Sequence, residues 1–321
     1  MKIVVLDGFT SMPGDISWDP EWFRLGELVV YDRSEPEEVV PRCLDAEIVI
    51  INKVVISRTV MEQLPKLRYI GILATGYNVV DIEAADELGI VVTNIPAYST
   101  MSVAQMVFSH LLNICYHVDT HARSVRNGEW NKAADFSYRL TPMFELDGKT
   151  MGIVGLGNIG MRVATIARTF GMKVIALTSK CQSELPEWIR KVDEPDDIFK
   201  ESDVLTLHCP LTASNADFVC ERTLALMKPT AVLINTGRGG LVDEQALASA
   251  LKEGRLTAAA LDVLREEPPR NGSPLIGLDN CYITPHIAWA TFESRQRLAA
   301  IALDNVRAFV EGHRQNHVGK A

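Results

Sequence analysis

The sequence predicts an α/β protein made of two doubly wound domains, each a parallel sheet covered by helices on both faces. Two observations predict this class. Short apolar strands alternate with helical stretches along nearly the whole chain, and strands that are apolar throughout are typical of parallel sheets buried on both faces. In addition, a glycine-rich turn, Gly155-Leu156-Gly157-Asn158-Ile159-Gly160, joins a predicted strand to a predicted helix.

Composition excludes several classes of function. The 321 residues are 47% hydrophobic and 23% charged, and the net charge of −9 argues against a nucleic-acid partner. The six cysteines form no CxxC pairs, so they predict neither a metal site nor a disulfide framework, and they fit reduced thiols in the cytoplasm. The apolar start of the chain is too short for a signal peptide, and the longest apolar helix is too polar to span a bilayer. We expect a cytoplasmic protein with no membrane partner.

The first domain is predicted from its alternating elements. Its expected strands are residues 2–7, 46–51, 67–73 and 90–93, with helical stretches between them, for example residues 57–64 and 81–88. Residues 94–99 form a crossing segment, and a final helix of residues 291–310 is long enough to return to this domain. We therefore expect residues 1–98 and 288–321 to form a flavodoxin-like, substrate-binding domain.

A long helix is predicted for residues 102–126, ended by Asn127-Gly128 and followed by an extended excursion over residues 130–146. Both segments are richer in apolar residues than the surface of a monomer should be. We therefore expect a homodimer formed through the region of the 102–126 helix.

The second domain, residues 99–287, is predicted to be a dinucleotide-binding (Rossmann) fold. Six strands are expected, at residues 150–154, 173–178, 204–209, 231–236, 258–263 and 282–284. In the glycine turn, Gly155 permits the tight turn, Gly157 leaves room for a pyrophosphate, and Gly160 lets the helix pack on the strand. The helix N-terminus favours phosphate. The alternative is a plain strand–helix turn without a ligand.

The second strand of this domain bears on the choice of coenzyme. Folds that prefer NAD usually end this strand with an acid that holds the adenosine ribose. Here Thr178, Ser179 and Lys180 stand at that place, and the next acid is Glu184. Hydroxyl groups and a lysine suit a 2′-phosphate, so the sequence predicts that NADP is at least accepted and favours it over NAD.

Three residues that could carry chemistry follow successive strands of this domain. Arg238 lies in a glycine-flanked turn and could bind a carboxylate through two parallel hydrogen bonds. His286 could donate a proton near neutral pH, and Glu267 could orient it. Each alone would more often be an ordinary surface group. Together they lie at the carboxyl ends of strands, where such folds bind ligands.

These motifs resemble, in order, those of the D-isomer-specific 2-hydroxyacid dehydrogenase family. The matching segments are the glycine turn and residues 235–244, 261–268 and 285–288, and the resemblance extends over essentially the whole chain. Within the family, residues 52–53, 74–78, 96–99 and 286–291 are most similar to the glycerate dehydrogenase (hydroxypyruvate reductase) branch.

The resemblance implies a reversible hydride transfer between NAD(P)H and a small 2-oxo acid. It implies that Arg238 holds the substrate carboxylate, that His286 exchanges the proton with the carbonyl oxygen, and that Glu267 keeps His286 protonated and oriented. Backbone N–H groups at Thr75, Gly76 and Tyr77 would complete the carboxylate site. Asp262 would hold the nicotinamide carboxamide. The remaining coenzyme contacts implied are Asn158, Ile159, Cys209, Pro210, Thr236, Gly237 and Ala288.

Lys53 follows a predicted strand of the first domain and could bind the carboxylate or the 3-hydroxyl group of a three-carbon acid; a surface lysine is the alternative. The leading substrate is hydroxypyruvate, with glyoxylate second. Oxidation of 3-phosphoglycerate is a second enzymatic possibility, although few basic residues beyond Lys53 and Arg58 are available for a phosphate. A binding protein that senses the coenzyme, like the corepressor relatives of this family, is the possibility of a different class.

Overall fold

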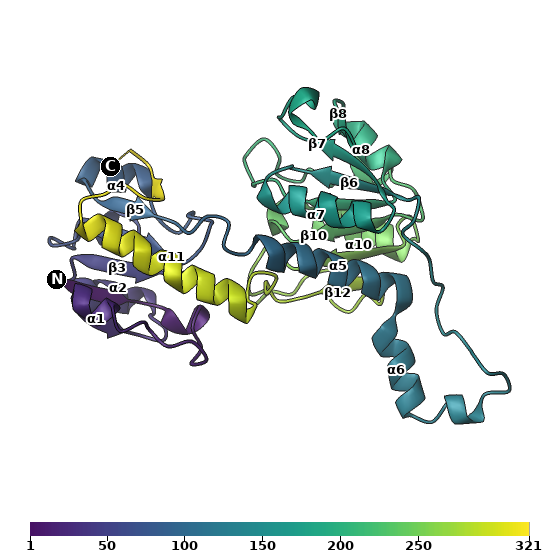
Figure 1. The fold of residues 1–321 in the computed structure, drawn as a ribbon, viewed down its shortest axis with the longest axis horizontal. Helices are drawn as coiled ribbons and strands as arrows, with labels where there is room; N and C mark the ends of the chain where they lie inside the picture. The colour runs from purple at the N-terminus through teal and green to yellow at the C-terminus, as the bar shows by residue number, and fades with distance from the viewer. Residues whose placement is uncertain (321) are drawn as a thin grey trace. The chain divides into compact units, whose positions relative to one another are not determined.

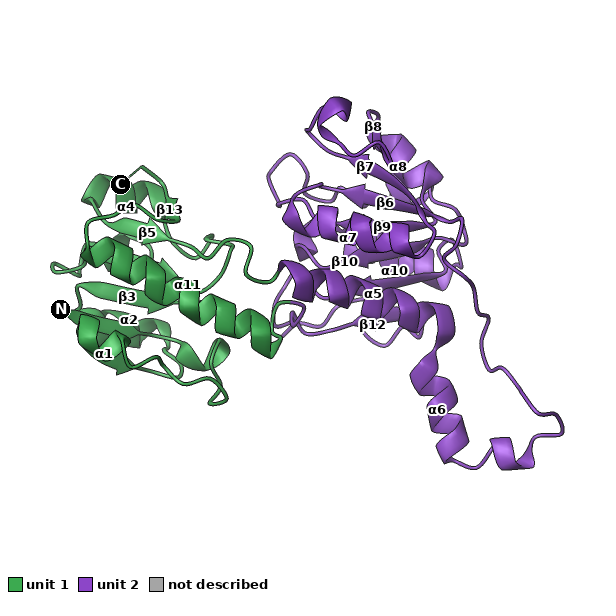
Figure 2. Ribbon diagram, viewed as in Figure 1, with its two compact units in different colours: residues 1–99, 289–321 green, residues 100–288 purple. Residues whose placement is uncertain are grey.

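The structure is a computed structural model that describes residues 1–320, and it divides into two compact units (Figures 1 and 2). The first unit contains Met1–Ser99 and the segment from Trp289 onward, and the second contains Thr100–Ala288. The second unit is thus inserted between two parts of the first. None of the helices in residues 1–320 has the length and apolar composition needed to cross a membrane.

The first unit is built on a six-stranded sheet in the order β13-β5-β4-β3-β1-β2. The strands are β1 (Lys2–Val5), β2 (Glu27–Val30), β3 (Ile48–Ile51), β4 (Tyr69–Ile72), β5 (Val91–Thr93) and β13 (His317–Val318). All pairs are parallel except β13 with β5. The edge strands β2 and β13 were not predicted. Neither is fully buried, and two residues of β13 carry no readable periodicity.

Helices cover both faces of this sheet because successive strand residues point to opposite sides. Val4 and Val49 face α2 (Pro36–Cys43), α3 (Arg58–Met61) and α4 (Ile82–Leu88). Ile3 and Ile50 face α1 (Trp22–Leu25) and the final helix α11 (Phe292–Val310). Thr291 caps α11 by accepting a hydrogen bond from the Ser294 N–H. A one-turn 3₁₀ helix, η1 (Gly8–Thr10), follows β1.

The second unit holds a seven-stranded, entirely parallel sheet in the order β12-β11-β10-β9-β6-β7-β8. Its strands are β6 (Thr150–Val154), β7 (Lys173–Leu177), β8 (Ile189–Val192), β9 (Val204–Leu207), β10 (Val232–Asn235), β11 (Ala258–Leu261) and β12 (Cys281–Ile283). The predicted count of six strands was wrong, because β8 was missed. Its sequence Ile-Arg-Lys-Val places two charged residues between the buried ends of a short edge strand.

Helices again lie on both faces. One face packs against α5 (Thr100–Tyr116) and α7 (Asn158–Thr169), and the other against α8 (Pro195–Glu201) and α10 (Glu244–Lys252). Single turns complete the unit: α9 (Glu221–Leu224), η3 (Gln182–Glu184) and η4 (Gly239–Leu241). Two sheets, parallel apart from the β13–β5 pair and each covered by helices on both faces, confirm the predicted fold class.

The single helix predicted for residues 102–126 was wrong. The chain forms two helices, α5 and α6 (Val118–Arg126), separated at His117, whose φ of 46° and ψ of 49° are left-handed (Figure 1). The His117 ring hydrogen-bonds the Tyr282 hydroxyl group at 3.2 Å, which ties the break to β12. No residue of α6 is buried. The excursion is extended as predicted and holds only one 3₁₀ turn, η2 (Trp130–Lys132), among the described residues.

Candidate active site

The glycine turn begins directly after β6 and leads into α7. Gly155 has a φ of +92°, and a Cβ there would lie 2.6 Å from the Cys209 amide nitrogen, so glycine is needed at this position. A Cβ on Gly160 would lie 2.2 Å from the Gly155 carbonyl oxygen, which shows how closely α7 approaches the turn. A Cβ on Gly157 would meet no heavy atom within 4 Å. The side of the turn at Gly157 is therefore open to a ligand.

A cavity of about 500 Å³ opens beside this turn. It is lined by the turn itself, by the ends of β7 and β9 and by the loop that follows β9. It is lined by seven predicted coenzyme residues: Gly155, Gly157, Thr178, Ser179, Lys180, Cys209 and Pro210. No acidic side chain is among its lining residues in the described chain. Asn158 and Ile159 begin α7, whose N-cap, Gly157, has no side chain to occupy the free N–H groups. These features fit the pyrophosphate and adenosine of a dinucleotide.

Glu267 and His286 come together as expected from the sequence. The Glu267 carboxylate lies 2.6 Å from His286 Nδ1 and also accepts a hydrogen bond from the Leu264 N–H at 3.0 Å. The His286 side chain keeps 28% of its surface exposed, so the ring is only partly buried. His286 has a φ of 54°, a left-handed conformation that costs a non-glycine residue about 1–3 kcal/mol. The backbone around His286 must therefore be held by its neighbours.

Asp262 holds the segment around His286 in place. It is 1% exposed, and its carboxylate accepts hydrogen bonds from the Thr284 hydroxyl group at 2.6 Å and from the N–H groups of Ile287 and Ala288 at 3.0 and 2.7 Å. These donors flank His286 on both sides. The role implied for Asp262 by the resemblance, holding a carboxamide, is thus joined by a second role that sequence reasoning missed. The Glu267–His286 pair and Asp262 line a cavity of about 290 Å³.

Arg238 lies after β10, in a turn fixed by its own backbone. Asn235, which is fully buried, accepts a hydrogen bond from the Gly237 N–H and donates one to the Arg238 carbonyl oxygen. One guanidinium N–H of Arg238 bonds the Gly237 carbonyl oxygen at 2.8 Å. A Cβ on Gly239 would lie 2.0 Å from the Leu264 carbonyl oxygen, so this turn packs tightly against the loop that carries Glu267. Thr236, at the start of the turn, has a buried hydroxyl oxygen with no partner among the described residues.

The remaining predicted residues belong to the first unit. Lys53 follows β3, and the loop that carries it is held by Asp7, whose buried carboxylate accepts hydrogen bonds from the N–H groups of Asn52, Lys53 and Val54. Burial raises the pKa of Asp7. The Asn52 side chain donates to the Leu73 carbonyl oxygen at 2.9 Å, directly before the Thr75–Tyr77 turn. Sequence reasoning missed Asp7 and Asn52, although an acid immediately after an apolar strand was a readable signal.

The Thr75–Tyr77 turn is pinned in a similar way. The Thr75 hydroxyl group donates to the Ile95 carbonyl oxygen, and the Asn94 side chain donates to the Thr75 carbonyl oxygen, each at 2.8 Å. Tyr77 keeps 44% of its surface exposed. In the first unit the hydrogen bonds of Asp7, Asn52 and Asn94 therefore hold both of the segments predicted to bind substrate.

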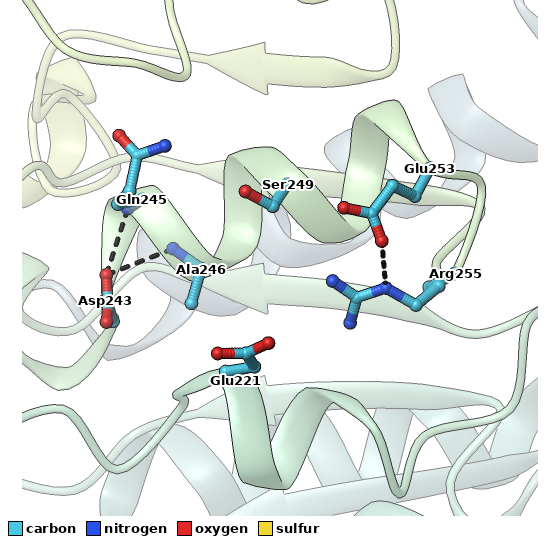
Figure 3. A pocket seen from close by; sticks show the side chains of 7 residues that line it. All are labelled: Glu221, Asp243, Gln245, Ala246, Ser249, Glu253 and Arg255. Carbon is cyan, nitrogen blue, oxygen red and sulfur yellow. Dashed lines mark hydrogen bonds and ion pairs between the residues drawn. The ribbon is translucent and has the colours of Figure 1, made fainter.

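Figure 3 shows a further cavity, of about 390 Å³, lined by residues of α9, α10 and the turn after α10. Asp243 there caps α10, and Glu253 accepts a hydrogen bond from Arg255 at 2.7 Å (Figure 3). None of the predicted site residues lines this cavity. No group of acidic, histidine or cysteine side chains in residues 1–320 has an arrangement that could hold a metal ion.

Comparison with known proteins shows the family to which the chain belongs. Residues 108–288 match the model of the D-isomer specific 2-hydroxyacid dehydrogenase, NAD binding domain. A hydroxypyruvate reductase of Blautia hydrogenotrophica is 45% identical over 323 aligned residues, which cover 100% of both chains. A glycerate dehydrogenase of Methylorubrum extorquens is 42% identical over 285 residues, which cover 88% of each chain.

Among solved structures, an acyclic imino acid reductase in complex with NADPH and D-arginine superposes with a TM-score of 0.85 at 31% identity, covering 99% of this chain and 100% of its own. The matched domain contains the glycine turn, Arg238, Glu267 and His286. The chain therefore belongs to the D-isomer-specific 2-hydroxyacid dehydrogenase family.

Proposed function

We propose that this dehydrogenase reduces hydroxypyruvate to D-glycerate, with glyoxylate as a second substrate that gives glycolate. The observation that carries the proposal is the 2.6 Å hydrogen bond between Glu267 and His286, next to the turn of Arg238. The two relatives reported above act, by their names, on hydroxypyruvate and on glycerate, the two ends of one reaction. A proton donor with an orienting carboxylate is what reduction of a ketone requires from the protein.

The roles follow from the geometry. Glu267 accepts the Nδ1–H of His286 and so leaves Nε2 to deliver a proton to the substrate's carbonyl oxygen. The Arg238 guanidinium, with one N–H committed to Gly237, offers its other N–H groups to the substrate carboxylate. The nicotinamide coenzyme, when bound, supplies the hydride for the carbonyl carbon. Hydride and proton together convert the carbonyl group into an alcohol, secondary in D-glycerate and primary in glycolate.

For the first unit, we propose that the N–H groups of Thr75, Gly76 and Tyr77 bind the substrate carboxylate and that Lys53 binds the 3-hydroxyl group. The support is that both segments are rigidly held, by Asp7, Asn52 and Asn94. The test is Lys53→Ala, measured with hydroxypyruvate and with glyoxylate, which has no 3-hydroxyl group. We expect KM to rise for hydroxypyruvate only, and equal constants for wild type and variant would exclude Lys53 from the site.

The coenzyme is proposed to be NADP(H) in preference to NAD(H). The cavity beside the glycine turn brings Thr178, Ser179 and Lys180 together without an acidic residue. A 2′-phosphate gains two hydroxyl donors and a cation there, whereas the ribose hydroxyls of NAD lack the usual carboxylate acceptor. Measuring kcat/KM with NADPH and NADH tests this, and Lys180→Ala should weaken NADPH alone. A hundredfold preference of the wild type for NADH would refute it.

A panel of about ten 2-oxo acids, each assayed with both coenzymes, tests the function as a whole. Turnover of hydroxypyruvate above all others is expected. If 3-phosphohydroxypyruvate were the best substrate, the phosphoglycerate alternative would replace our proposal. The relatives described above are enzymes by name, so the corepressor-like alternative gains no support from them. Absence of turnover with every acid would nevertheless favour it.

We also propose that the protein is a cytoplasmic homodimer joined through α5, α6 and the excursion that follows. Large apolar side chains are exposed there: Phe136 at 90%, Val118 at 64%, Leu140 at 51% and Trp130 at 50%. All six cysteines are unpaired, which fits a reducing compartment. Light scattering should give the mass of a dimer for the wild type and of a monomer for Phe136→Asp. Phe23→Asp, a matched change at an exposed phenylalanine of the first unit, should remain a dimer.

A further inference from the structure

His110 is a buried histidine on a helix face that otherwise packs as core. It is 7% exposed, and its neighbours on the buried side of α5 include Val107, Leu111 and Ile114. An aliphatic residue would fill this position without the cost of burying an imidazole. Packing alone therefore does not account for a histidine at this position, and the polar atoms of its ring must have a role.

The His110 ring contacts Thr284, the residue after β12. His110 Nε2 lies 3.2 Å from the Thr284 hydroxyl oxygen, and the same hydroxyl group lies 2.6 Å from Asp262 Oδ1. An ionised carboxylate can only accept hydrogen bonds, so the single hydroxyl proton of Thr284 points to Asp262. His110 Nε2 must then carry a proton and donate it to the hydroxyl oxygen. Burial lowers the pKa of His110, which agrees with a neutral ring.

The chain of hydrogen bonds continues from Asp262 to the backbone that directly follows His286. Asp262 accepts the N–H groups of Ile287 and Ala288, and Ser102, on the same helix as His110, donates to the Ala288 carbonyl oxygen. Between these fixed points, His286 is held at its left-handed φ of 54°. A residue persists in such a conformation only where its surroundings dictate it.

We propose that His110 is a positioning residue for the proton donor: by donating to Thr284, it orients the hydroxyl group toward Asp262 and thereby fixes the backbone that presents His286. His110 touches neither substrate nor coenzyme in this scheme and acts only through Thr284 and Asp262. The inference about hydrogen bonding stands on the geometry alone. Its consequence for turnover rests on the proposed role of His286.

The first test reads the tautomer directly. In protein labelled with ¹⁵N-histidine, two-bond ¹H–¹⁵N correlations distinguish the two neutral tautomers and the imidazolium, and the His110→Gln spectrum identifies the His110 signal. We expect a neutral ring protonated at Nε2. A ring protonated at Nδ1, or an imidazolium at pH 7, would overturn the proposal whatever the substrate of the enzyme proves to be.

The second test separates positioning from packing. His110→Phe removes the donor and keeps a planar ring, and we expect kcat to fall about tenfold, because a small displacement of a catalytic group is costly. KM for the 2-oxo acid and Kd for the coenzyme should change less than twofold. His110→Gln restores a donor and should recover kcat to within about threefold of wild type. An unchanged kcat in His110→Phe would refute the proposal, as would equal losses in the two variants.

A double-mutant cycle completes the test. Thr284→Val breaks the chain at its second link, so adding His110→Phe to it should cause no further loss of kcat. Additive losses would show that His110 acts independently of Thr284. All rates are compared per folded molecule, with folding checked by circular dichroism. The best 2-oxo acid of the wild type is used throughout, so failure of hydroxypyruvate as substrate is recognised separately.

Discussion

Replacing Gly157 by alanine tests the coenzyme site while leaving the fold intact. The φ of −81° and ψ of −158° at this position are accessible to alanine, and the added Cβ meets no heavy atom within 4 Å. The change should alter the free energy of unfolding by less than about 1 kcal/mol, the scale of an N-cap substitution. If a pyrophosphate lies against this turn, however, the methyl group takes its place. Overpacking of about 1–3 kcal/mol corresponds to a roughly 5- to 150-fold rise in Kd.

The assay is titration of NADPH and NADH by their fluorescence, together with thermal unfolding of the free protein. We expect Gly157→Ala to raise Kd for both coenzymes and to leave Tm within a few degrees of wild type. Gly160→Ala is the matched control for a steric clash inside the protein. Its Cβ would lie 2.2 Å from the Gly155 carbonyl oxygen, so this variant should lose about 1–3 kcal/mol of stability before any effect on binding.

Two results would refute the reasoning. If Gly157→Ala bound both coenzymes as tightly as wild type, the pyrophosphate would not approach residue 157. If Gly157→Ala unfolded as readily as Gly160→Ala, the space beside the turn would not be open, and the description of the cavity would be wrong.

Three further predictions concern stability. Asp7→Ala should lower the unfolding free energy by about 2–4 kcal/mol, because three N–H groups lose their acceptor; in urea unfolding, a loss no larger than that of Asp32→Ala, an exposed control, would contradict this. The hydrogen bond from Arg295 lowers the pKa of Asp15. On acidification, the Asp15 carboxylate therefore remains ionised in the folded protein at pH values at which it is already protonated in the unfolded chain. The stabilisation by this ion pair is present above the unfolded-state pKa of Asp15 and is lost as pH falls through the folded-state pKa. Asp15→Asn should therefore be less stable than wild type at pH 5, the deficit should shrink as pH falls below about 4, and a deficit that stays constant with pH would argue against it. Burial lowers the pKa of His208 from 6.5 to about 3, so wild type loses stability as pH falls from about 6.5, and His208→Gln should lose less between pH 7 and about 4.

The parts of the fold that the sequence predicted are those with a local signal. Ile48–Ile51 is apolar at every position and flanked by polar residues, so its strand could be located from the residue pattern alone. The same holds for β6, where the strand and the glycine turn reinforce one another. Glu267 and His286 could be paired in advance because both follow strands of one parallel sheet, whose carboxyl ends share an edge.

The features that were missed depend on partners far away in the chain. Residues 102–126 have the composition of one helix, and the break at His117 involves a hydrogen bond to Tyr282, 165 residues later. The bond from Asn52 to Asp7 spans 45 residues, and that from His110 to Thr284 spans 174. Helical propensity and periodicity are properties of neighbours in sequence. Propensity and periodicity therefore cannot show which backbone N–H groups will donate hydrogen bonds to which buried carboxylate.

The insertion of the second unit into the first has a consequence for the order in which the protein forms during synthesis. Chains generally fold from the N-terminus as domains emerge, yet the first unit needs Leu298, Leu303 and Val306 of α11 to cover Tyr69 and its neighbours. Until α11 has been made, this face of the first sheet has α1 against it but lacks the apolar side chains of α11. The second unit, whose residues are contiguous, can be complete by then. The domain whose synthesis starts first is thus completed last, and part of its apolar sheet face stays exposed to aggregation on the growing chain for longer.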